Sequence, residues 1–245
     1  MDMGLSDKVI VITGAASGIG AAIARAAVAE GARHLILTDR TPAPGLTAQA
    51  DLTNPDAPAT IIRSALHTHG RIDILVNAAG LTTRASTTSG TPEIWDSLFT
   101  VNARAAFFLM QAAIKDMLNR RAPGSILNIL SMNAHCGIPD LAIYSATKAA
   151  LATLTKNAAR THMADHIRVN GINLGWIATA TERHMQAVTL GRGPGWEAEE
   201  AARMPLGRLI TEDETARLAV FLMGTASEPM SGSIIDFEQK LAGAL

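Results

Sequence analysis

Short apolar runs recur along the chain, and longer amphipathic stretches separate most of them. Seven runs are typical of buried strands: Val9–Ile12, His34–Thr38, Thr47–Ala50, Ile72–Val76, Ser125–Leu130, Ile167–Ile172 and Ser233–Phe237. Helical patterns cover Gly18–Glu30, Ala57–His69, Pro92–Asn119, Ile143–His162, Glu182–Arg203 in pieces, and Glu212–Met223. Apolar strands that alternate with helices indicate a parallel sheet covered on both faces. The pattern therefore predicts an α/β fold: a doubly wound, Rossmann-like three-layer sandwich around a seven-stranded parallel sheet.

The connection between the second and third predicted strands is unusually short. Only Arg40 to Gly45 and a residue or two separate Asp39 from the third strand, whereas a parallel crossover normally takes a dozen residues or more. Two prolines and a glycine in this segment argue against a helix. We expect a crossover that has become a loop; the alternative is that the third strand is misplaced.

Composition limits the class of protein and of partner. A chain of 245 residues, 48 % apolar and 18 % charged, is typical of a well-packed globule, and we expect a single domain over 1–245. A net charge of −1 with scattered Lys and Arg does not favour a nucleic-acid partner. The only cysteine, Cys136, cannot form an internal disulfide, and Met1 to Lys8 lack the apolar segment of a signal peptide. Apolar runs such as Leu218 to Met223 are too short to span a bilayer, so we expect a cytoplasmic location and no membrane partner.

A glycine-rich turn follows the first predicted strand and opens the first helix. Glycines allow a tight turn and a close approach of the backbone to a diphosphate, and the helix N-terminus supplies free N–H groups. A lone glycine triad is weak evidence, but the order of strand, turn and helix supports a dinucleotide site. The residues expected to hold the diphosphate are Gly14, Ser17, Gly18, Ile19 and Gly20.

Asp39, at the end of the second strand, is placed to accept hydrogen bonds from the adenosine ribose and to repel a 2′-phosphate. Arg40 is the opposing signal, since a guanidinium could bind that phosphate. We favour NAD as the cofactor, with NADP as the alternative. Asp51 and Leu52 are candidates to flank the adenine; the alternative is an aspartate helix cap with a core leucine.

Tyr144, the only tyrosine, lies four residues before Lys148 in a stretch of helix-forming residues. Residues at this spacing share a helix face, so the phenol and the ammonium lie on the same side. A tyrosine pKa near 10 must fall by about three units, worth roughly 4 kcal/mol, to serve as a base near neutrality. A unit charge about 4 Å away supplies energy of that order at an effective dielectric near 20. A chance pair on a solvated helix is the alternative.

Taken in order, these motifs resemble the short-chain dehydrogenase/reductase family over essentially the whole chain. The matching positions are the glycine turn, the segment Asn77, Ala78, Ala79 and Gly80, then Asn102, Ser131, Tyr144 and Lys148. The resemblance implies that Tyr144 is the general acid/base and that Lys148 lowers its pKa and holds the nicotinamide ribose. It also implies that Ser131 binds the substrate oxygen and that Asn102 holds a water linking Lys148 to solvent. Asn77 would stabilise the central sheet, and Ala78, Ala79 and Gly80 would pack under the cofactor.

Two departures from the family pattern bear on the cofactor site. Ala78 replaces the usual second asparagine, and Leu174 replaces the proline that commonly precedes Gly175. The glycine is kept, and the resemblance lets Gly175, Ile177 and Thr179 contact the nicotinamide carboxamide and the diphosphate. The missing proline affects the fine geometry of this turn rather than the function.

The substrate side is expected beyond the strand ends. Asn133, His135, His184 and Arg192 could bind hydroxyls or a carboxylate, and Trp176 begins the segment 176–204, which we expect to be a substrate lid rather than a plain surface loop. These side chains favour a small polar polyol or sugar over a steroid. His135 and Cys136 alone do not make a metal site, so no metal is expected.

The sequence thus predicts an NAD(H)-dependent oxidoreductase that interconverts a secondary alcohol and a carbonyl, acting on a small-molecule alcohol or ketone. The alternatives are an NADPH-dependent ketoreductase and a non-catalytic nucleotide sensor, which would be expected to lose catalytic side chains. The family resemblance also implies a homotetramer, with Pro92–Asn119 and Ile143–His162 in one interface and the C-terminal segment in another.

Overall fold

The sheet of the protein has seven parallel strands. The computed structural model describes residues 2–135 and 137–240, so the inference about Cys136 lies outside the described residues. The strands are β1 (Val9–Thr13), β2 (His34–Asp39), β3 (Ala48–Gln49), β4 (Ile74–Asn77), β5 (Gly124–Ser131), β6 (Ile167–Leu174) and β7 (Ile234–Phe237). Their order in the sheet is β3-β2-β1-β4-β5-β6-β7, and every pairing is parallel. The predicted doubly wound α/β fold is therefore confirmed.

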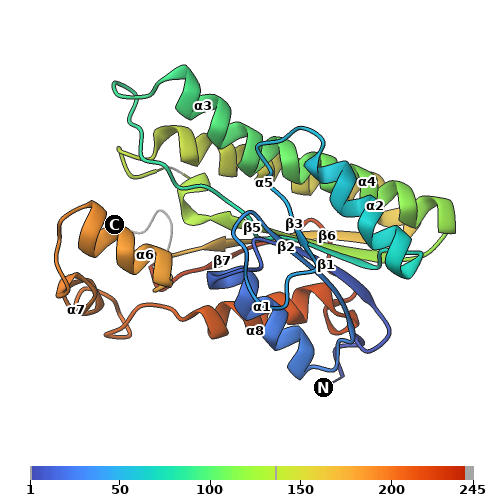
Figure 1. The fold of residues 1–245 in the computed structure, drawn as a ribbon. Helices are drawn as coiled ribbons and strands as arrows, with labels where there is room; N and C mark the ends of the chain where they lie inside the picture. The colour runs from blue at the N-terminus through green and yellow to red at the C-terminus, as the bar shows by residue number, and fades with distance from the viewer. Residues whose placement is uncertain (1, 136, 241–245) are drawn as a thin grey trace.

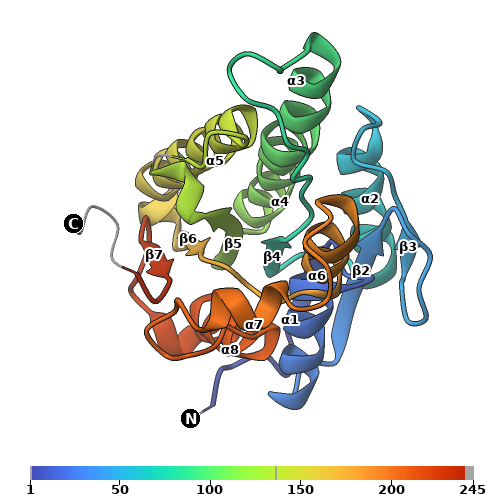
Figure 2. The same ribbon diagram turned by 90° about the vertical axis from the view of Figure 1, so that its left-hand side faces the viewer.

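Helices cover both faces of this sheet (Figures 1 and 2). On one face lie α1 (Gly18–Ala29) and α8 (Glu212–Met223), and on the other lie α2 (Ala57–His69), α4 (Ala106–Arg120) and α5 (Ala142–His162). Beyond the sheet, α3 (Pro92–Phe99) continues the line of α4, while α6 (Ala180–His184) and α7 (Trp196–Ala201) form a separate lobe after β6.

The strands alternate their side chains between two apolar cores. Val11, Leu75 and Ile126 pack against α2, α4 and α5, while Ile12 and Val76 pack against α1 and α8. Since successive strand residues point to opposite faces, a central parallel strand must be apolar throughout. This requirement explains the continuous apolar runs of the sequence.

The short crossover after β2 is a loop, as predicted. β3 has only two residues, and Ala48 and Gln49 pair with Thr38 and Asp39 in parallel. No helix occurs between Asp39 and Ala48. The third strand is thus correctly placed but shorter than expected, because it needs only a brief stretch of chain alongside the end of β2.

The helix predicted over Pro92–Asn119 is continuous but not uniform. A π-helical segment, Thr100–Ala105, separates α3 from α4 and contains Asn102. The whole helix, Pro92–Arg120, is long and apolar enough to cross a membrane, with a mean hydropathy of 1.3 in its most apolar stretch, contrary to the expectation that every apolar run is too short. Of that stretch, 56 % is buried in the protein, so packing against the sheet and α5 accounts for its apolar character.

Candidate functional site

Three glycines shape a cradle at the carboxyl end of β1. Gly14 has a φ of +71°, and a Cβ placed on it would lie 2.7 Å from the backbone nitrogen of Ala79. A Cβ on Gly20 would overlap the carbonyl of Gly14, and Gly18 has a φ of +56°. Side chains are therefore excluded where the turn passes under the segment after β4, as close backbone packing around a diphosphate requires.

The N-terminus of α1 above this cradle is uncapped. Ser17 is the N-cap residue, but its side chain makes no capping hydrogen bond, and the first turn of the helix contains no acidic residue. A Cβ on Gly18 would lie 3.8 Å from Cγ2 of Thr179, so Thr179 faces the same point from the segment after β6. Free N–H groups and the positive end of the helix dipole make this an anion site.

Asp39 closes the cradle from the end of β2. Its Oδ2 accepts a hydrogen bond from the backbone N–H of Ala16 at 3.0 Å, and its Oδ1 accepts one from Thr41 at 2.9 Å. The carboxylate is thereby oriented beside the glycine turn, where a ribose is expected. Arg40 is exposed beside it.

The candidates for the adenine site are arranged differently. Asp51 accepts hydrogen bonds from the backbone and the hydroxyl of Thr53, which together with the charge of Arg40 lower its pKa. The N-cap of α2 is Asp56, so Asp51 closes a turn instead of capping the helix. Leu52 is buried in the core, as one of the two alternatives expected.

The segment after β4 is fixed to its neighbours. Asn77 Nδ2 donates to Asn128 Oδ1 at 2.8 Å, which joins β4 to β5 as expected of a residue that stabilises the central sheet. The backbone N–H of Ala79 donates to the hydroxyl of Thr13 at 3.2 Å, which ties the segment to β1. A Cβ on Gly80 would lie 3.5 Å from Lys148 Nζ, so this glycine lies beside the ammonium group of the lysine.

Asn102 lies in the π-helical segment and is almost fully buried. Its side chain exchanges two hydrogen bonds with the backbone of Leu81, at 2.8 and 2.9 Å, and donates to Thr147 on α5 at 3.1 Å. The amide therefore holds the segment after β4 against the helix that carries Tyr144 and Lys148. The water-mediated link to Lys148 stays a prediction.

Tyr144 and Lys148 are both buried on α5, one turn apart. Burial raises the pKa of Tyr144, hydrogen bonding with Ser131 opposes the rise, and the charge of Glu182 adds to it. Burial also lowers the pKa of Lys148 to about 8. Its Nζ donates to the carbonyl of Ile129 at 2.8 Å and lies 5.8 Å from the centre of the tyrosine ring. The net pKa of Tyr144 is therefore raised, because desolvation of the phenolate outweighs the effects that favour it, and the expected lowering by Lys148 stays a prediction.

Two predicted substrate residues lie beside Ser131 and make contacts with the protein. Asn133 Oδ1 accepts a hydrogen bond from the backbone of Ile138 at 3.3 Å. His135 Nε2 lies 2.9 Å from Asp236 Oδ1 and 3.1 Å from Asn173 Nδ2, which joins the ends of β6 and β7. His184 is exposed on α6, and no hydrogen bond among the described residues joins it to Tyr144.

The segment 176–204 has a small core of its own. Trp176 stacks on Trp196 with ring centroids 5.7 Å apart, and the guanidinium of Arg192 lies 5.8 Å from the Trp196 ring. Trp176 Nε1 donates to Glu182 Oε1 at 2.9 Å. Sequence reasoning missed Glu182; the only signal available was its position three residues after Thr179, whose hydroxyl accepts its backbone N–H and caps α6.

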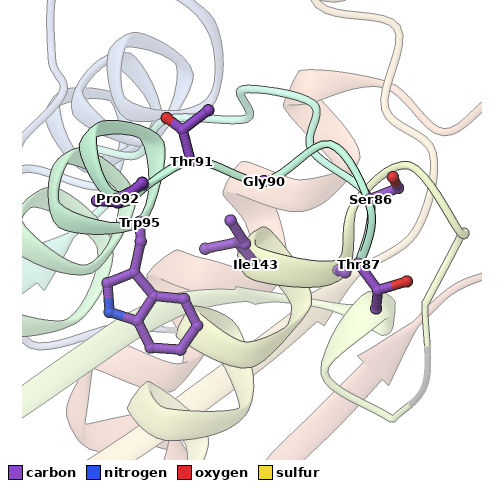
Figure 3. Close-up of a pocket in the computed structure, with 8 residues that line it drawn as sticks. Ser86, Thr87, Gly90, Thr91, Pro92, Trp95 and Ile143 are labelled. Atoms are coloured by element: carbon purple, nitrogen blue, oxygen red, sulfur yellow. The ribbon is translucent and has the colours of Figure 1, made fainter.

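A cavity of about 500 Å³ lies between residues 86–95 and the start of α5 (Figure 3). Trp95, Ile143 and Pro92 give it an apolar lining, with Ser86 and Thr91 among the polar residues around it. Ile143 immediately precedes Tyr144, yet neither Tyr144 nor Ser131 lines this cavity. It neighbours the candidate catalytic side chains without including them.

Comparison with known proteins decides the family. A sequence-family model described as enoyl-(acyl carrier protein) reductase matches residues 14–238. The chain is 33 % identical to 2-(S)-hydroxypropyl-CoM dehydrogenase 3 of Xanthobacter autotrophicus, with 94 % of each chain covered. The chain is a short-chain dehydrogenase/reductase. It is also 32 % identical to galactitol 2-dehydrogenase of Agrobacterium fabrum, over 92 % of this chain and 94 % of that one. L-sorbose reductase of Gluconobacter frateurii, solved with NADPH and L-sorbose, matches all of both chains with a TM-score of 0.90 and 30 % identity.

As a short-chain dehydrogenase/reductase, the protein is an NAD(P)-dependent enzyme that acts on alcohol and carbonyl groups. Its departure at Leu174 has a visible consequence: β6 continues to this residue, two positions beyond the predicted end. Gly175 then donates its N–H to the carbonyl of Phe237 at 3.0 Å, and Ile177 is buried. The turn is thus held without the proline.

Proposed function

We propose that the protein is an NAD(H)-dependent oxidoreductase that interconverts a secondary alcohol and a carbonyl, with Tyr144 as the general acid/base. The observation that carries this proposal is the convergence of Ser131, Tyr144 and Lys148 at the carboxyl end of β5. The Ser131 side chain lowers the pKa of Tyr144, and Lys148 Nζ lies 5.8 Å from the centre of the tyrosine ring; both support the proposal. Open α/β sheets bind their ligands at this edge.

The residues present fit a dinucleotide. The glycine cradle and the uncapped N-terminus of α1 would hold the diphosphate, and Lys148, beside Gly80, would hold the nicotinamide ribose. When bound, the nicotinamide supplies the hydride acceptor or donor.

The protein's own groups handle the proton. Ser131 orients the substrate oxygen by a hydrogen bond, and Tyr144 takes the hydroxyl proton during oxidation and returns it during reduction. A cationic Lys148 beside the ring favours the phenolate and opposes the effect of burial. Asn102 keeps the segment after β4 against α5, so the geometry of these groups is fixed before substrate binds.

Asp39 supports NAD(H) over NADP(H). Its carboxylate is held beside the glycine turn by two backbone N–H groups, where it would accept bonds from ribose hydroxyls and repel a 2′-phosphate. The second candidate is an NADPH-dependent reductase, favoured by the NADPH in the L-sorbose reductase structure and by the exposed Arg40 next to Asp39.

A small polyol or sugar is the proposed substrate class. Galactitol 2-dehydrogenase and L-sorbose reductase support it by similarity, and the polar side chains after β5 and β6 support it from this chain. Residues 1–245 form one Rossmann-type domain in this proposal, with 176–204 as its substrate lid.

A homotetramer is proposed for the assembly. A groove of about 320 Å³ between α4 and α5 is lined by Phe107, Leu118 and Leu154 among others. Phe107 and Leu118 are each 38 % exposed, an apolar surface that a second copy would cover. Sedimentation analysis tests this point: a monomer at micromolar concentration would contradict it.

Replacing Tyr144 by Phe tests the proposed function. It removes the hydroxyl and keeps the buried ring, so kcat should fall by a factor of about 10² to 10⁴ while NADH still binds. Assays with NAD(H) and NADP(H) against polyols, sugars and ketones provide the readout for the wild type and the variant. Undiminished turnover by the variant would contradict the role of Tyr144.

A further inference from the structure

The two carboxylate oxygens of Glu182, on α6, differ in their hydrogen bonds within the described residues. Trp176 Nε1 donates to Glu182 Oε1 at 2.9 Å, and Gln186 Nε2 donates to the same atom at 2.7 Å. No described residue donates to Oε2. Two donors on one oxygen fix the direction of the carboxylate and leave two lone pairs on the other.

A chain of buried hydrogen bonds supports this arrangement. Gln186 is 3 % exposed, and its Oε1 accepts a hydrogen bond from Arg192 at 3.1 Å. Arg192 in turn binds the buried carboxylate of Glu200 at 2.8 Å. The guanidinium is therefore engaged by Glu200 and reaches Glu182 only through an amide, so it does not neutralise the Glu182 charge.

Glu182 lies at the ligand-binding edge of the sheet as well as on the lid. Thr179, whose hydroxyl accepts the backbone N–H of Glu182, lies 3.8 Å from a Cβ placed on Gly18 at the start of α1. Trp176 follows β6 after one residue, and its backbone N–H binds a second carboxylate, Glu238 Oε2, at 3.2 Å. Open α/β sheets bind their ligands at this carboxyl edge, and the charge of Glu182 also raises the pKa of Tyr144.

We propose that Glu182 determines substrate specificity: its free oxygen accepts a hydrogen bond from a hydroxyl of a neutral polyol or sugar, and its charge excludes substrates that carry an anionic group there. This inference rests on the proposed function and sharpens its substrate class. A hydroxyl bound to a carboxylate makes a charge-assisted hydrogen bond. An anion at the same place meets like-charge repulsion in a partly desolvated site, and specificity arises from both effects.

A purely structural role is the competing explanation, in which Glu182 only anchors Trp176 and Gln186. Glu182→Gln separates the two roles, because the amide oxygen can accept both bonds while the charge is lost. Glu199→Gln is the matched control: Glu199 is also on the lid, its side chain is 62 % exposed, and it lies 3.6 Å from Arg192. Trp176→Phe is the second variant, since it removes a donor to Glu182 and keeps the charge.

The test compares matched pairs of substrates that differ only in one terminal group. D-glucitol and D-gluconate are one pair, galactitol and D-galactonate another, each a hexitol and the acid that replaces one CH₂OH by COO⁻. The ratio of kcat/KM for acid to hexitol is measured at several salt concentrations. Glu182→Gln should raise this ratio about tenfold, most at low salt, while Glu199→Gln leaves it unchanged. Trp176→Phe should keep the wild-type preference and raise KM for the hexitol.

The outcomes separate this inference from the proposed function. If Glu182→Gln is active and its ratio equals that of the wild type, the specificity role is overturned and the proposed function stands. If the wild type turns over other secondary alcohols but prefers the acid in each pair, the specificity role of Glu182 is likewise overturned and the proposed function stands. If a chain that binds NADH turns over no alcohol or carbonyl compound, the proposed function and this inference both fail.

Discussion

Two helices on the same face of the sheet, α1 and α8, begin in opposite ways. Thr211 and Glu214 form a full capping box at the start of α8, and its first turn also contains Glu212 and Asp213. The start of α1 has no side-chain cap and no acidic residue, although Ser17 occupies the N-cap position in an extended conformation suited to capping. The two helices pack side by side on the same face of the sheet (Figure 1).

We infer from this difference that the free N–H groups at the start of α1 bind a ligand. Unpaired N–H groups at a helix start need a partner, and α8 supplies its own from its side chains. In α1 the glycines keep the space above these groups free of side chains, and Asp39 binds the preceding backbone N–H of Ala16 from outside the helix. Stability contributed by a cap is given up where the cofactor is expected to bind.

Among variants that test this difference between α1 and α8, Ser17→Asp should have the largest effect, which is on NADH affinity. An aspartate would cap α1 as Thr211 caps α8 and would place a negative charge where the diphosphate is expected. We expect NADH binding to weaken about 100-fold, equivalent to roughly 2.7 kcal/mol, without loss of thermal stability. Fluorescence titration with NADH and a thermal melt measure both effects. An unchanged affinity for NADH would show that this terminus is not the anion site.

Gly20→Ala should have the next largest effect. The new Cβ would overlap the carbonyl of Gly14 and push α1 away from the turn. A clash with backbone of this kind costs about 1 to 3 kcal/mol of unfolding free energy, and NADH affinity should fall with it.

Gly195→Ala is the control for added volume. A Cβ on Gly195 meets nothing within 4 Å, and its φ of −79° suits alanine. Denaturant unfolding should show a stability equal to or slightly above that of the wild type. An equal loss of unfolding free energy in Gly20→Ala and Gly195→Ala would contradict the close backbone packing inferred at Gly20.

Thr211→Ala should have the opposite effects to Ser17→Asp: a loss of stability without a loss of NADH affinity. Loss of the cap on α8 should lower the free energy of unfolding by about 1 kcal/mol, and NADH affinity should stay the same. Urea unfolding and NADH titration of the same preparation check this pairing. A fall in affinity as large as that of Ser17→Asp would mean that α8 also serves the cofactor.

Glu214 gives the smallest effect, a dependence of stability on pH. Hydrogen bonds from Arg208, and then from the backbone of Thr211, lower its pKa to about 2. A depressed folded-state pKa stabilises the protein above the unfolded value and loses that effect as pH falls toward the folded one. Because the pair is largely exposed, the contribution is small. Melting temperatures between pH 5 and pH 3 should fall less steeply for Glu214→Gln than for the wild type, and identical slopes would contradict this.

The sequence predicted most where local signals decide the structure. The bounds of α8 match the prediction because a capping box and a glycine mark its ends. The helix-free crossover after Asp39 followed from its prolines and its length. The π-helical segment around Asn102 has no sequence signal, because it depends on the contacts of that side chain with Leu81 and Thr147.

The chemistry of the site was predicted less completely than its residues. Spacing identified Tyr144 and Lys148 but not the direction of the tyrosine pKa, which depends on burial and on how Lys148 is bound. Glu182 was not predicted for a similar reason, since only the folded lid brings it into contact with Trp176 and Gln186. Tertiary surroundings determine these properties, and spacing along the chain does not contain them.

Calorimetric titration of the wild-type chain with NADH, and with NADPH in parallel, tests the central claim that a dinucleotide binds between the start of α1 and Lys148. The account predicts saturable binding of one dinucleotide per chain, tighter for NADH than for NADPH because of Asp39. Failure of both dinucleotides to bind would contradict it.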